Sequence, residues 1–303
     1  MKLFVDRRSL VHYCVLLFGS LFFSLAARMA SEKFYPLAFF SFVLAVLFAW
    51  IAVVREVNEA AIYMPDSMRR PVHWIYAETF EIFALIVLGF LRVTSPFRKS
   101  QSISCAFNTR PILLVHGYLN AGHVWDFHKK ILAKKGFGPI YTIDLGHPFQ
   151  SIRSYALKVQ EKARQIAKET GSSELNIIGH SMGGLVSYYY VAKLAQAYSV
   201  PQLITIGSPL QGTRIAKIGF GQCAHDMRPD SELIKEMHVA IESCNDVKFY
   251  NIATRTDVLV VPYTSAFFKS ESQHQLCFDD IGHASLLFSK RVSNQLCAWL
   301  KNP

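Results

Sequence analysis

Five consecutive residues, Gly179-His180-Ser181-Met182-Gly183, carry the pattern G-x-S-x-G. This pattern is typical of a nucleophilic serine on a sharp turn between a strand and a helix. The flanking sequence fits, since Leu175–Ile178 is apolar and strand-like and Leu185–Ala197 has helical periodicity. Side chains at positions 179 and 183 would collide with the neighbouring strand and helix, so glycine is required there. The sequence therefore predicts Ser181 as a nucleophile.

A serine hydroxyl needs a base that takes its proton and an acid that holds the tautomer of that base. With this turn, the chain order is serine, then acid, then histidine. His283 follows the last expected strand, near Gln273–Phe278, and is the predicted base. His274 falls within that strand, and His225 and His238 lie in a long insertion, so these three are expected to be structural or exposed.

The predicted acid is Asp257, which follows the expected strand Val247–Ala253. An acid at the carboxyl end of that strand can reach a histidine on the next loop. The other carboxylates considered are expected to be surface charges or helix caps: Asp144, Asp226, Asp230, Asp279 and Asp280.

Attack on a carbonyl creates an oxyanion that needs two fixed N–H donors. One predicted donor is the backbone N–H of Met182, directly after the nucleophile. The other is the backbone N–H of Tyr118, in the loop His116–Leu119 after the first expected strand. The side chain of His116 is expected to shape this loop rather than to take a proton.

Short apolar segments alternate with helical ones from Arg110 onward. This alternation predicts an α/β fold with a mostly parallel sheet of about six strands and helices on both faces. The expected strands are Pro111–Val115, Pro139–Ile143, Leu175–Ile178, Gln202–Ile206, Val247–Ala253 and Gln273–Phe278. The expected helices are Val124–Lys135, Ile152–Glu169, Leu185–Ala197 and Ala284–Leu300.

The segment 207–246 is a long insertion after the strand Gln202–Ile206, with an expected helix at Ser231–Ile241. Insertions of this kind form a lid or the wall of an acyl pocket, or serve as ordinary connections. The sequence leaves both readings open.

Four segments carry a family resemblance: Pro111–Gly117, Gly179–Gly184, Ile206–Thr213 and Gly282-His283. Over roughly residues 110–300 the chain resembles the α/β-hydrolase lipases, in particular small bacterial triacylglycerol lipases and inositol-deacylase-like lipases. The resemblance implies carboxylic ester hydrolysis through the triad already named, with no cofactor. Some such lipases hold a structural calcium ion, but no residues here are assigned to it.

The part before residue 110 is strongly apolar. Leu10–Ala27 and Leu37–Val54 are each 18 residues without a charge, near the lower length limit of a membrane-spanning helix. They predict a helical-hairpin anchor within residues 1–60. Leu10–Ala27 also resembles a secretory signal peptide with a cleavage site at Ser24-Leu25-Ala26. The second apolar run favours the anchor.

A third apolar segment, Val72–Val93, lies in the predicted linker 61–109 before a catalytic domain at 110–303. Glu78 and Glu81 make its first half polar for a membrane-spanning helix, so a helix at the interface or packed on the catalytic domain is an alternative of at least equal weight. A third span would place the catalytic domain outside, with a basic segment on the wrong side. With two spans, the positive-inside rule places the catalytic domain on the cytoplasmic side of a bacterial inner membrane.

The formal net charge is +10, but the sequence has no pattern of arginines and aromatic residues that would indicate nucleic-acid binding. The six cysteines have no metal-ligand spacing, and free thiols are favoured over a Cys223–Cys244 bridge. The expected partners are a membrane and a lipid or other acyl ester. A membrane acyltransferase with the same acyl-enzyme and a non-catalytic, membrane-tethered binding protein are the alternatives.

Overall fold

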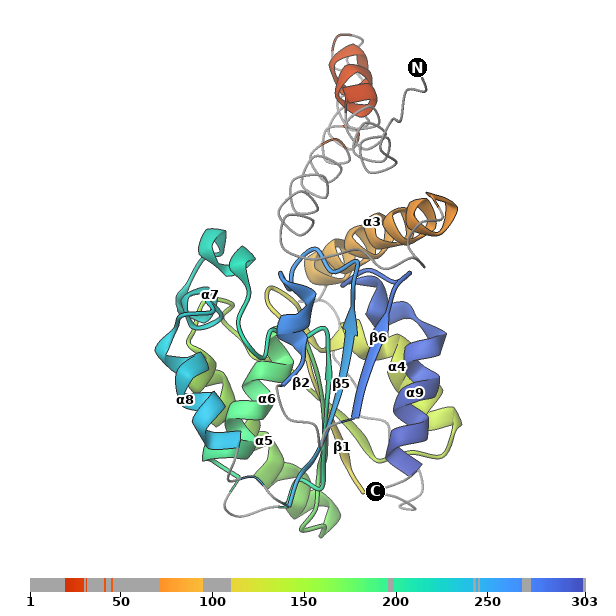
Figure 1. Ribbon diagram of the computed structural model, residues 1–303. Coiled ribbons are helices and arrows are strands. Elements are labelled where there is room, and N and C mark those ends of the chain that lie inside the picture. Colours follow the sequence, from red (N-terminus) through yellow and green to blue (C-terminus); the bar gives the residue numbers. More distant parts are fainter. Residues whose placement is uncertain are drawn as a thin grey trace, which may run out of the picture. The chain divides into compact units, whose positions relative to one another are not determined.

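The computed structural model describes residues 20–29, 31, 41, 45, 71–94, 110–195, 199–241, 244, 246–268 and 274–301. The chain divides into two compact units, Met1–Ile82 and Phe83–Pro303. The second unit contains every strand of the described residues and all of the candidate site (Figure 1).

Six parallel strands form one sheet in the order β2-β1-β3-β4-β5-β6. The predicted parallel sheet is therefore confirmed. Most of the strands are short and rich in apolar residues because both faces of a parallel sheet are covered. Their bounds are β1 Ile112–Val115, β2 Ile140–Ile143, β3 Asn176–His180, β4 Gln202–Ile206, β5 Lys248–Thr254 and β6 His274–Phe278.

Helices cover the sheet on both sides, as Figure 1 shows. One apolar core lies under α4 (Asp126–Lys134) and α9 (Lys290–Lys301). The other lies under α5 (Ile152–Thr170), α6 (Met182–Lys193) and α8 (Glu232–Ile241). Burial of these two faces is the main stabilising contribution to the fold.

The expected final helix Ala284–Leu300 is wrong as a single element. The chain forms a short 3₁₀ helix, η6 (Ser285–Phe288), then extends at Ser289 before α9 begins. Ser289 is the cap of α9, because its Oγ accepts a hydrogen bond from the Val292 N–H (3.4 Å). Sequence periodicity did not reveal this interruption, since apolar residues continue across it.

The expected helix Val72–Val93 is confirmed as α3 (Pro71–Thr94). Ala84 and Leu88 of this helix are buried in the same apolar cluster as α4 and α9. Among the described residues, no helix is both long and apolar enough to cross a membrane. Of the predicted spans 10–27 and 37–54, residues 20–27, 41 and 45 are helical, and the others lie outside the described residues.

The insertion 207–246 contains η4 (Arg214–Ile218), α7 (Gln222–Asp226) and α8. The buried carboxylate of Asp226 ties it to the domain, since Oδ2 accepts from the Ile152 N–H at the start of α5 (2.8 Å). Asp226 is therefore neither a surface charge nor the N-cap of α5, which is Ser151, but a buried carboxylate that binds the first N–H of that helix. Cys223 and Cys244 are free thiols.

His128 in α4 is fully buried and joins α4 to the segment after His283. Its Nε2–H donates to the Leu286 carbonyl (3.0 Å), and its Nδ1 accepts from the Ser293 hydroxyl (2.7 Å). A neutral ring satisfies both bonds, and burial lowers the pKa of His128 from 6.5 to about 4.

Because the pKa of buried His128 is lowered, we expect the protein to lose stability in acid. The unfolded chain takes up a proton at His128 near pH 6.5, whereas the folded chain does so only near pH 4. The free energy of unfolding is therefore unaffected by the titration of His128 above pH 6.5, and it falls by about 3 kcal/mol in total as the pH drops to 4. Urea unfolding of His128→Gln in the full chain should show a shallower loss of stability across this range than wild type. His225→Gln, at an exposed site, is the control and should keep the wild-type slope; equal slopes for both variants would contradict the assignment.

Candidate active site

Ser181 occupies a strained turn between β3 and α6. Its φ of 56° and ψ of −129° are rare for a residue with a side chain. Its N–H donates to the Ile206 carbonyl (2.9 Å), and its carbonyl accepts from the Gly184 N–H (3.0 Å). The serine thus lies at the carboxyl edge of the sheet, at the start of a helix.

The glycines around Ser181 are required by close packing. A Cβ at Gly179 would lie 2.5 Å from the Gly184 Cα, and one at Gly183 would lie 2.3 Å from the Val115 carbonyl oxygen. The collisions expected from the sequence at positions 179 and 183 are confirmed. Gly184 is equally restricted, because its Cβ would lie 2.0 Å from the Ser208 Oγ.

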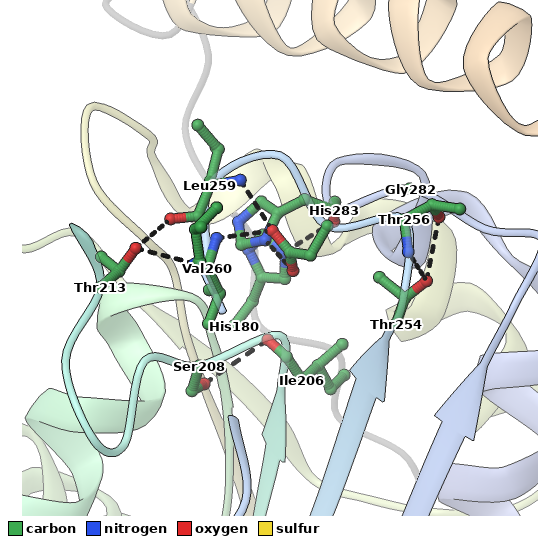
Figure 2. Close-up of polar contacts among 12 residues, drawn as sticks. His180, Ile206, Ser208, Thr213, Thr254, Thr256, Leu259, Val260, Gly282 and His283 are labelled. Atoms are coloured by element: carbon green, nitrogen blue, oxygen red, sulfur yellow. Dashed lines mark hydrogen bonds and ion pairs between the residues drawn. The ribbon is translucent and has the colours of Figure 1, made fainter. Parts of the chain in front are cut away.

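His283 and Asp257 form a buried pair. The His283 Nδ1 lies 2.8 Å from the Asp257 Oδ2, and the Asp257 Oδ1 accepts from the backbone N–H groups of Leu259 (2.8 Å) and Val260 (2.7 Å). Figure 2 labels His283, Leu259 and Val260. Both carboxylate oxygens therefore accept, so the Nδ1 of His283 carries the proton and Nε2 keeps its lone pair. This is the tautomer that a general base requires.

Three threonines hold the loops that carry this pair (Figure 2). The Thr213 hydroxyl donates to the Leu259 carbonyl (2.7 Å) and accepts from the Val261 N–H (3.0 Å). The hydroxyls of Thr254 and Thr256 both donate to the Ile281 carbonyl, two residues before His283. Sequence reasoning missed these residues. The signal for Thr254 and Thr256 is a threonine at or just after the end of β5, and that for Thr213 is its place in the segment Ile206–Thr213.

Gly207 and the residue before it contact both the serine turn and the histidine ring. It follows Ile206, which bonds the Ser181 N–H, and it has a φ of 53°. A Cβ at Gly207 would lie 3.2 Å from the His283 Nδ1, so the ring packs directly against this glycine. On the other side, a Cβ at Gly117 would lie 3.3 Å from the Ser181 Oγ. Residues 206–207 therefore contact both the serine turn and the His283 ring, and Gly117 contacts the serine from the loop of Tyr118.

The two expected oxyanion donors belong to residues near Ser181, one next to it in the chain and one next to Gly117, which packs on it. Met182 is the first residue of α6, where backbone N–H groups are free to bind an anion. Tyr118 follows Gly117, which packs on Ser181. Within the part of the chain that the structure describes, neither of the two N–H groups donates a hydrogen bond to the protein.

His116 shapes the loop of Tyr118, in agreement with the expectation. Its Nε2 accepts from the Leu145 N–H (3.1 Å), which leaves the proton on Nδ1, 2.9 Å from the Gly117 carbonyl oxygen. Burial is the main cause that lowers the pKa of His116. The ring is therefore neutral and is occupied at both nitrogens.

His180 is a residue of the site that the sequence analysis did not single out. It is buried, and its ring centroid lies 4.8 Å from that of His283. Burial holds the pKa of His180 well below 6.5, and the nearby His283 lowers it further. The neutral ring has its Nε2 3.2 Å from the His283 carbonyl oxygen, to which Nε2–H donates. Its place inside the G-x-S-x-G motif was the only available signal.

The other histidines and aspartates considered as base or acid make contacts elsewhere than with His283 and Asp257. His225 and His238 are exposed in the insertion, and His274 stacks on Tyr250 from β6. Asp279 pairs with Arg255 (3.1 Å), and Asp280 pairs with Arg291 (2.6 Å). No cluster of metal ligands is found among the described residues.

Comparisons with known proteins find similarity to thioesterases and lipases. The family model of palmitoyl protein thioesterases matches residues 111–244. A triacylglycerol lipase of Pseudarthrobacter phenanthrenivorans is 31% identical over 115 residues, which are 35% of this chain and 35% of that enzyme. A triacylglycerol lipase of Burkholderia plantarii is also 31% identical, over 35% of this chain and 31% of the relative. The match therefore spans about a third of the length of these relatives.

A solved structure shows the fold. The mature lipase BlEst2 of Bacillus licheniformis superimposes with a TM-score of 0.57 at 17% identity, over 66% of this chain and 96% of the lipase. With the parallel sheet and the strand–serine–helix turn, this likeness shows that the chain has the α/β-hydrolase fold. The two relatives are triacylglycerol lipases by name, and the solved structure shows a likeness of fold.

Proposed function

We propose that this α/β-hydrolase is a lipase or esterase that cleaves carboxylic esters through Ser181, His283 and Asp257. One observation carries the proposal. The buried His283–Asp257 pair has the tautomer of a base and packs against Gly207, beside a serine held on a strained turn. A merely structural serine would not need a conformation that costs about 1–3 kcal/mol.

In the proposed reaction, the His283 Nε2 takes the Ser181 proton while Oγ attacks the ester carbonyl. The oxyanion accepts hydrogen bonds from the N–H groups of Tyr118 and Met182. His283 then gives its proton to the leaving alcohol, and an acyl-enzyme remains. Water, deprotonated by His283, releases the acid and restores Ser181.

The substrate class is proposed to be a lipid or another long-chain acyl ester. Similarity to triacylglycerol lipases supports an oxygen ester, and the match to the palmitoyl protein thioesterase family supports a long acyl thioester as a second candidate. Both bonds pass through the same acyl-enzyme. Transfer of the acyl group to an alcohol instead of water is the acyltransferase alternative.

We also propose that residues 10–27 and 37–54 anchor the chain in a bacterial inner membrane, with the catalytic unit on the cytoplasmic side. Their support is the two uncharged runs and the arginines and lysines that flank them. An anchor would hold the site close to acyl lipids.

A fluorophosphonate probe tests the proposed function in the full chain. It should label the protein stoichiometrically, and peptide mapping should find the adduct on Ser181. An adduct on another serine would contradict the assignment, and no adduct would favour a binding protein without catalysis. Hydrolysis of p-nitrophenyl esters of increasing chain length, with and without a competing alcohol, then separates hydrolase from acyltransferase. Acyl-CoA thioesters assayed in parallel decide between the two ester classes.

A further inference from the structure

Four large apolar side chains are exposed around the loop of Tyr118. They are Leu119 (44% exposed), Phe149 (40%), Ile218 (60%) and Phe220 (76%), and we call them the apolar rim. Within the described part of the chain after residue 109, only two other large apolar side chains are comparably exposed, Leu157 and Val239. Scattered exposed apolar residues are normal, whereas a group of four on one surface indicates a partner.

Contacts between distant segments bring the rim together. The Tyr118 hydroxyl donates to the Phe220 carbonyl (2.9 Å) and accepts from the Phe220 N–H (3.2 Å). The rings of Tyr118 and Phe149 are 6.4 Å apart, and the Gln222 N–H donates to the Phe149 carbonyl (3.0 Å). Residues from three loops therefore form one surface beside Ser181.

The rim is held outward by its backbone. Leu119 has a φ of 57°, a conformation that residues with a side chain rarely adopt. Gly221 has a φ of 84° and packs so closely that a Cβ would lie 2.5 Å from the Phe149 Cβ. With the two bonds at Phe220, these features fix the exposed side chains in place instead of letting them collapse inward.

The segments that carry the rim contain cations and no carboxylate, although the exposed Asp144 accepts from the Gly122 N–H (2.6 Å) in one of them. The segments 117–125, 145–151 and 214–225 contain no Asp or Glu, whereas Arg214 and Lys217 are exposed in the same stretch as Ile218 and Phe220. Apolar side chains flanked by cations are the chemistry that binds a bilayer with anionic headgroups. An apolar protein partner would not need this excess of positive charge.

We propose that the apolar rim docks on an anionic lipid surface, with Ile218 and Phe220 at the level of the headgroups. The surface is inferred from exposure and charge alone. Its consequence for catalysis, that an acyl chain leaves the bilayer beside Tyr118 and Ser181, rests on the proposed function.

A tryptophan probe tests docking without any activity. Phe220→Trp, in the full chain reconstituted in vesicles of phosphatidylcholine and phosphatidylglycerol, should gain emission that brominated lipid quenches. Leu157→Trp, on an exposed site of α5, is the matched control and should be quenched several-fold less. Adding Arg214→Gln and Lys217→Gln should reduce the quenching of the Phe220 probe. Equal quenching of both probes, or quenching independent of the anionic lipid and of these two cations, would overturn the proposal and favour another partner.

An activity comparison distinguishes failure of docking from failure of the proposed function. The pair Ile218→Ser and Phe220→Ser should lower turnover of a vesicle-borne ester about tenfold, with a soluble short-chain ester unaffected, because two apolar anchors are lost. Leu157→Ser with Val239→Ser should affect neither rate. Turnover equal to wild type on vesicles, without quenching of the probe, would overturn docking alone. Quenching retained in a chain that cleaves no ester would overturn the proposed function and leave docking intact.

Discussion

Replacement of Ser181 by alanine is expected to lower ester turnover by about 10⁵–10⁶-fold, the scale seen when a serine hydrolase loses its nucleophile. His283 and Asp257 would remain paired, but no oxygen would be left to attack the carbonyl. Initial rates and fluorophosphonate labelling of the full chain measure the loss. Binding of a substrate should be nearly unchanged, because the hydroxyl contributes to the transition state rather than to the acyl pocket.

Ser187→Ala is the matched control for this prediction. Ser187 is buried in α6, one turn after the elbow, and its hydroxyl donates to the Gly183 carbonyl (2.7 Å). Its removal should change turnover only a few-fold. Residual activity of Ser181→Ala above a hundredth of wild type would mean that another nucleophile acts.

Asp257→Asn is expected to lower turnover by about 10⁴-fold, as the same change does in the serine-protease triad. The reason is geometric. Two backbone donors, the N–H groups of Leu259 and Val260, face Oδ1, so the amide oxygen of asparagine must take that position. The amide NH₂ is then directed at the His283 Nδ1, which must accept a hydrogen bond. The proton moves to Nε2, where the ring can no longer act as a base.

The rate of Asp257→Asn against pH measures this effect, because hydroxide replaces part of the missing base at high pH and the deficit should narrow. Asp280→Asn serves as the control. Asp280 precedes the same loop but pairs with Arg291 at the surface, so its change should leave the rate within about twofold, as for other exposed ion pairs. A rate of Asp257→Asn within tenfold of wild type would move the acid to another carboxylate.

Much of this site was predictable because parallel strands end at one edge of a sheet. Asp257 follows β5, His283 follows β6 and the loop of Tyr118 follows β1, so their order along the chain limits where their side chains lie. The hydrogen bond between His283 and Asp257 agrees with that reasoning. Whether these groups act on an ester stays a prediction until the two variants are measured.

Other features had no local signal. The Tyr118 hydroxyl and Phe220 are 102 residues apart, and no periodicity relates them. The role of Thr213 depends on a loop 46 residues away, and that of His180 depends on the carbonyl of His283. Such contacts follow from the assembled fold rather than from propensity, and so they were missed. The break at Ser289 has a local cause, the side-chain cap, but the apolar pattern around it concealed the cap.

The side chain and the backbone of Tyr118 serve two different regions. Its backbone follows Gly117, which packs on Ser181, while its hydroxyl holds the segment of Phe220 both as donor and as acceptor. Residues 214–221 are therefore structurally coupled to the loop of Tyr118. A substitution that moves the backbone of this segment would therefore also move the loop of Tyr118, whereas exchange of the exposed side chains of Ile218 and Phe220 leaves both backbone bonds in place.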